Sequence, residues 1–311
     1  MTHKLTAYLT GATGFIGYNI ADILVKNGWD VYALYRNHSD TGKLQKLGVK
    51  LVYGHLGDTD SLKNGMPDKV DSVFHTAGNV SFEKTRNKEQ NQDNIEGTRN
   101  IIQAAIYNGC KRFIYTSSAA TFGIHKELIK EETKSNALEI PINYFHSKTL
   151  AEEIVKDIYK AGDLDTVILN PANVVGPHDT KIWGPFVLSI VNGTLTSIGS
   201  GTGSFCHVKS VANAHLNAFK VGKSGHQYLL AGTTATFYEV CEIISNLCNC
   251  NKPLVTKGLI NGLSDEISQL MNYEQRINCK KAIDELEFET VTLEKMFGDL
   301  LEWLRFSGQL K

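Results

Sequence analysis

The feature that most constrains the fold is a glycine-rich stretch near the start of the chain, residues 10–17, which reads Thr-Gly-Ala-Thr-Gly-Phe-Ile-Gly. An apolar run over residues 5–9 precedes it, and a helical pattern with apolar residues on one face follows it. Glycines at a strand-to-helix turn allow a tight turn, close approach of a pyrophosphate and close packing of the helix on the strand. The helix N-terminus then faces the anion. We therefore predict a phosphate-binding turn at Gly11, Gly14 and Gly17.

The rest of the chain distinguishes this turn from an ordinary glycine-rich loop. No Gly-Lys-Ser/Thr follows, which argues against a nucleotide-triphosphatase loop. Strand patterns alternate with helical patterns, and this rhythm predicts a parallel sheet with helices on both faces, a Rossmann-type doubly wound α/β fold. The predicted strands cover residues 30–36, 49–53, 71–76, 112–116 and 166–169, and the two long helices cover residues 88–107 and 142–161.

A change of rhythm beyond Pro171 indicates a second domain. Segments become shorter, and Gly, Pro and Trp become denser. We predict an NADP-binding Rossmann domain over residues 1–172, to which residues 211–235 return. A smaller, mostly helical substrate domain then consists of residues 173–210 and 236–311. Within it, Thr236 and Glu239 have the spacing of a capping box at the start of a helix.

Composition restricts the partners. The 311 residues carry a formal net charge of −1 with both signs interspersed, so neither nucleic acid nor an anionic membrane is expected as the main partner. No apolar run reaches the roughly 18 residues of a membrane span, and no export signal is visible. We expect a cytoplasmic protein with reduced cysteines. The only close pair, Cys248 and Cys250, lacks a second ligand pair, so no metal site is predicted.

The end of the second predicted strand indicates the cofactor. In dinucleotide sites an acid there binds the ribose 2′-hydroxyl of NAD, whereas an arginine accommodates the 2′-phosphate of NADP. This strand ends Leu34-Tyr35-Arg36, without an acid. A guanidinium can hold a phosphate through two hydrogen bonds and stack on adenine, and Lys43 adds a second charge. A merely solvated arginine is the alternative. The pattern favours NADP, with NAD as the alternative.

Tyr144 and Lys148 form the candidate catalytic pair. Their spacing places them one turn apart on the same face of the second long helix. A phenol has an ordinary pKa of about 10, and an adjacent ammonium is expected to lower it. Tyr144 then serves as general acid towards a carbonyl or as base towards an alcohol. By itself this spacing occurs by chance in many helices.

Polar residues on two other predicted elements support the pair. Ser118 follows a predicted parallel strand at its carboxyl end, where open α/β sheets place ligands, and can hold a substrate oxygen beside Tyr144. The alternative role for both Ser118 and its neighbour Ser117 is to cap the end of the strand, and Ser117 is consistent with that role alone. Asn94, in the first long helix, is expected either to orient a water or backbone group behind Lys148 or to be an ordinary interior asparagine.

These motifs, in this order, resemble the extended short-chain dehydrogenases/reductases, also called the NAD-dependent epimerase/dehydratase family. The resemblance extends to about Ala231 and includes the motifs at residues 94–100, 115–123 and 170–177. Within the family, the sequence is most similar in pattern to dihydroflavonol-reductase-like carbonyl reductases. The resemblance implies catalytic roles for Ser118, Tyr144, Lys148 and Asn94, and a homodimer formed through the two long helices. With the turn and the two cations, it implies a cofactor site of Gly11, Thr13, Gly14, Phe15, Ile16, Gly17, Arg36, Lys43, His55, Leu56, Thr76, Ala77, Gly78, Tyr144, Lys148, Pro171, Ala172, Asn173 and Val174.

Two departures from the family pattern limit what can be said of the substrate. His55 stands where the family often has an aspartate, so the usual carboxylate near the adenine is missing. Lys209 and Ser210 replace two acids that commonly follow the His-Val pair at 207–208. These changes leave the predicted fold intact.

Three functions remain open. The leading one is an NADP-dependent reductase of a small-molecule ketone or aldehyde, in which Tyr144 donates the proton and Lys148 holds the nicotinamide ribose. A nucleotide-sugar epimerase is favoured by Asn173 but lacks the expected basic residue before His207. A non-catalytic NADP-binding sensor is disfavoured because both catalytic side chains are present. The substrate pocket is expected to be lined by residues 80–83, Phe122, Phe145 and 178–186.

Overall fold

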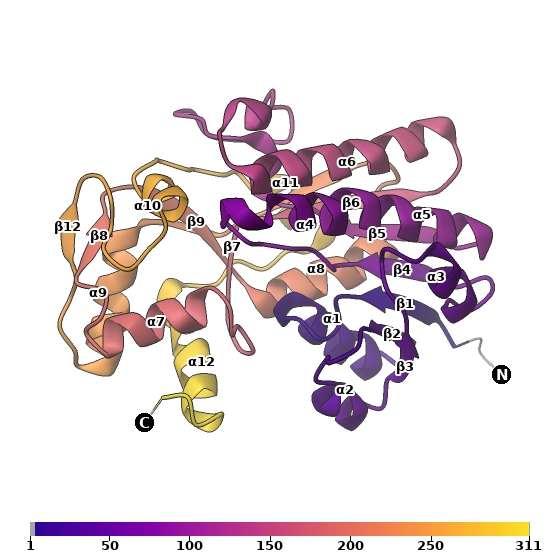
Figure 1. The fold of residues 1–311 in the computed structure, drawn as a ribbon, viewed down its shortest axis with the longest axis horizontal. Helices are drawn as coiled ribbons and strands as arrows, with labels where there is room; N and C mark the ends of the chain where they lie inside the picture. The colour runs from indigo at the N-terminus through magenta and orange to yellow at the C-terminus, as the bar shows by residue number, and fades with distance from the viewer. Residues whose placement is uncertain (1–3, 311) are drawn as a thin grey trace.

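The computed structural model describes residues 4–310, and its centre is a seven-stranded sheet (Figure 1). Every neighbouring pair in this sheet is parallel, in the order β10-β6-β5-β4-β1-β2-β3. The strands are β1 (Thr6–Thr10), β2 (Asp30–Tyr35), β3 (Lys50–Tyr53), β4 (Ser72–His75), β5 (Arg112–Thr116), β6 (Thr166–Pro171) and β10 (Gln227–Leu230). The predicted doubly wound Rossmann-type fold is confirmed.

Helices cover both faces of this sheet because its strands carry apolar side chains on both sides. On β1, Ala7 and Leu9 pack in one core, with α1 (Phe15–Lys26), α2 (Gly42–Leu47) and α8 (Val208–Lys220). Tyr8 points to the opposite face, in a core built with α3 (Thr59–Gly65), α5 (Gly97–Tyr107) and α6 (Asn143–Ala161). Figure 1 shows α5 and α6 side by side over that face.

The first long helix differs from its prediction as one regular helix over residues 88–107. It begins as α4 (Asn87–Asn91), passes through a π-helical segment, Gln92–Glu96, and continues as α5. Asn94 lies in the π-helical segment, a kind of distortion that often occurs at functional sites.

A smaller lobe lies beside the carboxyl ends of the sheet strands and contains strands that the sequence did not indicate. Its three-stranded sheet is β11-β9-β7, and its two-stranded sheet is β12-β8. These strands are β7 (Asn173–Val175), β8 (Ser197–Gly199), β9 (Thr202–His207), β11 (Thr233–Thr236) and β12 (Leu254–Thr256); the helices are α7 (Trp183–Val191), α9 (Phe237–Cys248), α10 (Asp265–Leu270) and α12 (Leu293–Phe306). Strands of three to six residues, rich in Gly, Ser and Thr, show no alternating apolar pattern.

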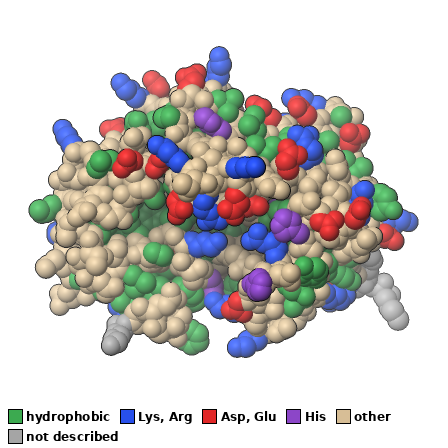
Figure 2. Space-filling model, viewed as in Figure 1, with side chains coloured by type: hydrophobic (Ala, Val, Ile, Leu, Met, Phe, Trp, Pro, Cys, Tyr) green, Lys and Arg blue, Asp and Glu red, His purple; other side chains and the backbone are tan. Residues whose placement is uncertain are grey.

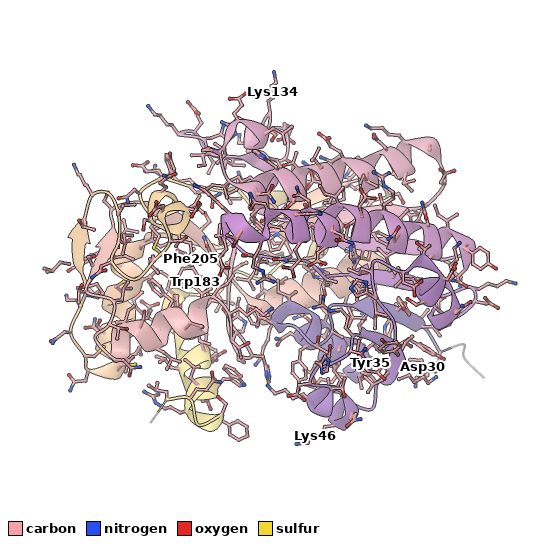
Figure 3. All side chains as sticks on the ribbon, viewed as in Figure 1. Asp30, Tyr35, Lys46, Lys134, Trp183 and Phe205 are labelled. Carbon is pink, nitrogen blue, oxygen red and sulfur yellow. The ribbon has the colours of Figure 1, made fainter. Side chains whose placement is uncertain are left out.

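Aromatic side chains form the core of this lobe. Trp183 and Phe205, which Figure 3 labels in this lobe, meet edge to face with ring centroids 5.3 Å apart, and Phe297 packs against both rings. The predicted capping box opens α9: Thr236 accepts a hydrogen bond from the Glu239 N–H at 3.0 Å, and the Glu239 carboxylate accepts one from the Thr236 N–H at 2.7 Å.

Within residues 211–235, which the sequence assigns to a return to the large sheet, α8 packs on α1 and β10 pairs with β6, whereas β11 pairs with β9 in the smaller lobe. A further return is not predicted. Residues 277–288, which include α11 (Lys280–Leu286), pack in the core of the large sheet beside α8 and β10, although the sequence assigns them to the smaller domain. The reason is apolar burial, since Ala282 and Leu286 are fully enclosed in that core.

Candidate active site

A cavity of about 700 Å³ lies between the carboxyl ends of the sheet strands and the smaller lobe. Figure 2 shows basic, acidic and histidine side chains gathered around the middle of the face seen in Figure 1. Every residue predicted to bind the cofactor lines this cavity, and so does Ser118. Asn94 does not line it. The topology accounts for this convergence, because the loops that follow parallel strands meet at one edge of the sheet.

The glycine turn is packed too tightly for side chains. Gly11 has φ +75°, and a Cβ placed on it would lie 2.6 Å from the Ala77 nitrogen. A Cβ on Gly17 would collide with the carbonyl oxygen of Gly11. Gly14 caps α1 without any side-chain hydrogen bond, and the first turn of that helix contains no acid. The first N–H groups of α1 therefore remain available for an anion, so the turn fits a pyrophosphate.

Cations without carboxylate partners line the same cavity. Among residues 4–310, none forms an ion pair with Arg36, Lys43 or Lys181. Lys43 lies over the Trp303 ring, 5.4 Å from its centroid. Asp40, an acid that also lines the cavity and that the sequence argument missed, accepts a hydrogen bond from the Gly42 N–H at 3.0 Å. The unpaired positive charge suits a phosphorylated ligand.

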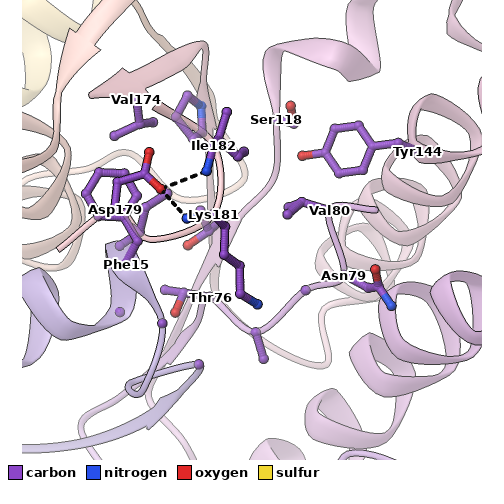
Figure 4. A pocket seen from close by; sticks show the side chains of 18 of the residues that line it. Phe15, Thr76, Asn79, Val80, Ser118, Tyr144, Val174, Asp179, Lys181 and Ile182 are labelled. Atoms are coloured by element: carbon purple, nitrogen blue, oxygen red, sulfur yellow. Dashed lines mark hydrogen bonds between the residues drawn. The ribbon is translucent and has the colours of Figure 1, made fainter. Parts of the chain in front are cut away.

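Tyr144 and Ser118 face each other across the cavity (Figure 4). Ser118 Oγ accepts the Ala120 N–H at 3.1 Å, so its own proton is not needed for that bond and can be offered to the cavity. Burial raises the pKa of Tyr144, and the neighbouring Ser118 hydroxyl acts in the opposite direction. The expected lowering by Lys148 is therefore wrong for this structure. Desolvation of the phenolate dominates, and the ammonium of Lys148 is directed elsewhere.

Lys148 is buried one turn further along α6. Its Nζ donates hydrogen bonds to the Tyr115 hydroxyl and the Thr116 carbonyl oxygen, both at 2.9 Å. Burial lowers the pKa of Lys148 to about 7, although the nearby Glu152 carboxylate favours the charged form. The side chain is thus held at the end of β5, beside the residues that precede Ser118.

Glu152 is a buried residue of this site that sequence reasoning missed. Its Oε2 accepts hydrogen bonds from Ser117 Oγ at 2.6 Å, Thr121 Oγ1 at 3.0 Å and Asn170 Nδ2 at 2.6 Å. These donors flank the backbone of Ser118. The signal was available, because Glu152 follows Lys148 by one helical turn on the same face. Ser117 therefore anchors the strand end to α6.

The side chain of Asn94 is hydrogen bonded to the loop after β4 and does not orient Lys148. Its side-chain amide brackets the backbone of Asn79 in the loop after β4: Oδ1 accepts the Asn79 N–H at 2.7 Å, and Nδ2 donates to the Asn79 carbonyl at 3.0 Å. Nδ2 also donates to Ser147 Oγ at 3.0 Å. The expected contact with a backbone group is present, but it fixes the loop that carries the cavity residues Asn79 and Val80.

The predicted substrate pocket is correct in part. Val80, Phe82, Phe145 and residues 178–183 line the cavity. Phe122 and Phe186 are buried in the two cores instead. Further lining residues come from distant parts of the chain, which no local pattern could reveal, namely Thr202, Gly203, Phe237, Leu270, Tyr273 and Gln275.

Comparison with known proteins identifies the family. A sequence profile of the NAD dependent epimerase/dehydratase family matches residues 7–231, which include the glycine turn, Ser118, Tyr144 and Lys148. The chain belongs to this family. The predicted resemblance to extended short-chain dehydrogenases/reductases is thus confirmed, and the chain is an enzyme of that NAD(P)-dependent superfamily.

Relatives within the epimerase/dehydratase family differ in their named activities. Sterol demethylase protein B of Methylococcus capsulatus is 27% identical, covering 98% of this chain and 100% of that protein. Dihydroflavonol 4-reductase of Arabidopsis thaliana is 26% identical, covering 96% and 85%. The structure of UDP-glucose 4-epimerase from Bifidobacterium longum, in complex with NAD+ and UDP, superposes with a TM-score of 0.82 at 23% identity, covering 97% and 99%. That last similarity shows the common fold.

Proposed function

We propose that this enzyme is an NADP-dependent oxidoreductase that reduces the carbonyl group of a small-molecule ketone or aldehyde. The observation that carries the proposal is that the hydroxyl groups of Ser118 and Tyr144 face each other inside the cavity, with the phenol kept protonated by burial. A protonated phenol is the form that a general acid requires. The similarity to dihydroflavonol 4-reductase supports the same direction of reaction.

The residues present fit a dinucleotide. We assign the diphosphate to the glycine turn, the 2′-phosphate to Arg36 with Lys43, and the nicotinamide end to residues 171–174, Tyr144 and Lys148. We assign the adenine and ribose sides to His55, Leu56 and residues 76–78, which line the cavity. His55 Nδ1 accepts the Gly57 N–H at 2.9 Å, so its ring is already oriented by the local turn. When bound, the nicotinamide supplies the hydride.

The protein groups then handle the proton at the substrate oxygen. Ser118 and Tyr144 bind this oxygen together, and Tyr144 Oη donates its proton as negative charge develops there. In its charged form Lys148, fixed by Tyr115 and Thr116, retains a third N–H for the nicotinamide ribose hydroxyls. Asn94 and Glu152 act through other residues, since each holds a backbone segment that lines the cavity.

A nucleotide-sugar epimerase is the alternative, and the structural similarity to an epimerase in complex with NAD+ and UDP favours it. Asn173 is compatible with it, because its Nδ2 donates one hydrogen to the Ser204 carbonyl at 3.0 Å and keeps a second for a substrate phosphate. The missing basic residue before His207 argues against it. A non-catalytic sensor has no corresponding support, because the cavity contains the complete Ser118, Tyr144 and Lys148 set. We further propose a cytoplasmic location and a homodimeric state.

The test combines cofactor binding with turnover. Fluorescence titration should give a lower dissociation constant for NADPH than for NADH, and a panel of ketones and aldehydes should show stoichiometric consumption of NADPH. Tyr144→Phe should still bind NADPH, because the contacts assigned to the diphosphate and the 2′-phosphate remain, but it should lower kcat/KM by about 10²- to 10⁴-fold, the usual contribution of a general acid. Conversion of a nucleotide sugar without net consumption of cofactor would instead establish the epimerase. If Tyr144→Phe reduces the substrate as fast as the wild type, Tyr144 is not the general acid.

A further inference from the structure

The loop that connects β7 to α7, residues 176–182, is fixed to the helix that begins at the glycine turn. Asn19 of α1 donates a hydrogen bond from Nδ2 to the Pro177 carbonyl at 3.3 Å. The His178 ring packs on the Tyr18 ring, also of α1, with centroids 4.3 Å apart. On its other side the His178 ring meets Trp303 of α12 at 5.2 Å. The loop therefore links the smaller lobe directly to α1.

The other end of this loop is fixed to α7. The buried carboxylate of Asp179 accepts backbone N–H groups from Lys181 at 2.9 Å, Ile182 at 3.0 Å and Trp183 at 2.7 Å. A Cβ on Gly184 would collide with the Asp179 carbonyl oxygen, so the loop packs directly against the helix. The backbone of Lys181 is thus held in place before any ligand binds.

The Lys181 side chain enters the cavity instead of pairing on the surface. Figure 4 shows it extending from the loop towards the segment after β4 that carries Thr76 and Asn79. Within the described part of the chain its ammonium has no ion-pair partner. Two acids that line the same cavity accept hydrogen bonds from other groups: Asp179 from the backbone at the start of α7, and Asp93 from Asn79 Nδ2 at 3.1 Å. The segment after β4 packs against the glycine turn, since a Cβ on Gly11 would lie 2.6 Å from the Ala77 nitrogen, so an anion held at the turn would attract this ammonium.

We propose that Lys181 binds the diphosphate of the dinucleotide from the side opposite the glycine turn. Backbone N–H groups of residues 15–17, at the start of α1, would hold one side, and the ammonium would supply a mobile point charge on the other. This inference rests on the proposed function in requiring a dinucleotide. It is independent of the preference for NADP, because the diphosphate is common to NADP and NAD. A bound cofactor would then join the two lobes through a charged contact.

The test separates the diphosphate from the 2′-phosphate. Dissociation constants of the full-length protein are measured for NADPH, for NADH and for adenosine 2′-monophosphate, which lacks the diphosphate. Lys181→Gln should weaken both dinucleotides by on the order of tenfold, as expected for one charge-assisted contact, and leave adenosine 2′-monophosphate unchanged. Arg36→Ala should weaken NADPH and adenosine 2′-monophosphate but not NADH. Lys181→Arg should restore most of the dinucleotide affinity.

The control is Lys134→Gln, an exposed lysine that Figure 3 shows projecting away from the cavity, and it should change no dissociation constant. The loss in Lys181→Gln should shrink as salt is added, because the contact is open to solvent. Unchanged dinucleotide affinity with a raised KM for the carbonyl substrate would overturn the proposal and assign Lys181 to the substrate. Tighter binding of NADH than NADPH would remove the role of Arg36 while leaving the Lys181 result decisive. Binding of neither dinucleotide would overturn both proposals.

Discussion

At the scale of single residues, burial shifts the pKa values of Tyr144 and Lys148 in opposite directions, and in both cases it favours the neutral form. Desolvation keeps the phenol protonated and makes the ammonium easier to deprotonate, with the pKa of Lys148 at about 7. The hydrogen bonds from Lys148 to Tyr115 and Thr116 hold the amine whichever charge it carries. The pair therefore combines a proton donor with a cation whose charge disappears near neutral pH.

This shift predicts a dependence of stability on pH. Below pH 7 Lys148 is charged in both folded and unfolded chains, and the cost of burying the charge is fully present. Between about pH 7 and the ordinary lysine pKa of about 10.4, the unfolded chain binds a proton that the folded protein does not, so stability rises with pH. Lys148→Met should lack this rise and be inactive throughout.

The measurement is urea unfolding at pH 6 and pH 9. The difference in unfolding free energy between Lys148→Met and the wild type should move in favour of the wild type at the higher pH. Lys160→Met, an exposed position on the same helix, serves as the control and should show the same difference at both pH values. If the difference in unfolding free energy between Lys148→Met and the wild type is the same at pH 6 and pH 9, the lowered pKa of Lys148 is contradicted.

The sequence predicted residues whose role depends on spacing and missed those whose role depends on the fold. Tyr144 and Lys148 are one turn apart on one helix, and Ser118 follows a strand, so helical and sheet geometry suffice to bring them to one cavity edge. Lys181 falls within the predicted pocket lining of residues 178–186, but the direction of its side chain could not be predicted, because the position of its loop depends on contacts with α1 and α12. The pKa of Tyr144 depends on burial that local spacing does not specify.

At the scale of elements, the glycine turn joins β1, α1 and the loop after β4 with almost no free space. Gly17→Ala should destroy cofactor binding, since the added Cβ would collide with the Gly11 carbonyl and displace the N–H groups at the start of α1. Gly298→Ala is the matched control: this glycine lies within α12, and a Cβ there would meet no atom within 4 Å. It should stabilise the protein by up to about 1 kcal/mol, because alanine favours a helix.

Two measurements distinguish these variants. Thermal unfolding should show a slightly higher midpoint temperature for Gly298→Ala than for the wild type. NADPH titration of this variant should give the wild-type dissociation constant. Gly17→Ala should lose NADPH binding by at least about 100-fold even where it remains folded by circular dichroism. Normal NADPH affinity in Gly17→Ala would mean that the turn does not hold the diphosphate.

Elements with strong periodicity were predicted well, and short ones were not. The predicted helix over residues 142–161 corresponds to α6, because its apolar face repeats over five turns. The π-helical segment around Asn94 leaves the amino-acid pattern helical while changing the hydrogen bonds, so the sequence shows only a continuous helix. Strands β8 and β12 are three residues each, and only their pairing in the folded chain defines them.

At the scale of the whole molecule, the site belongs to neither lobe alone. The large sheet and its helices supply the glycine turn, Ser118 and Tyr144, and the smaller lobe supplies Lys181 and Trp183. The His178 contacts with α1 and α12 hold the two parts together at the edge of the cavity. Within residues 4–310, no helix has both the length and the apolar character needed to cross a membrane.

The outer face of α5 and α6 leads to a prediction about assembly. Ile106 and Leu150 are 40% and 39% exposed on these two neighbouring helices. A two-fold contact between copies would bury both side chains against their counterparts, as an isologous interface requires.

Because the protomer has a mass of 34.4 kDa, sedimentation equilibrium should give twice that value for the wild type. Leu150→Glu should weaken the dimer by at least about tenfold, since it adds a charge beside Glu153 and replaces an apolar contact. Leu128→Glu, at a position 46% exposed outside these helices, should leave the mass unchanged. A wild-type mass of 34.4 kDa at micromolar concentration would show that this face does not form a dimer, and equal dissociation by both variants would place the interface elsewhere.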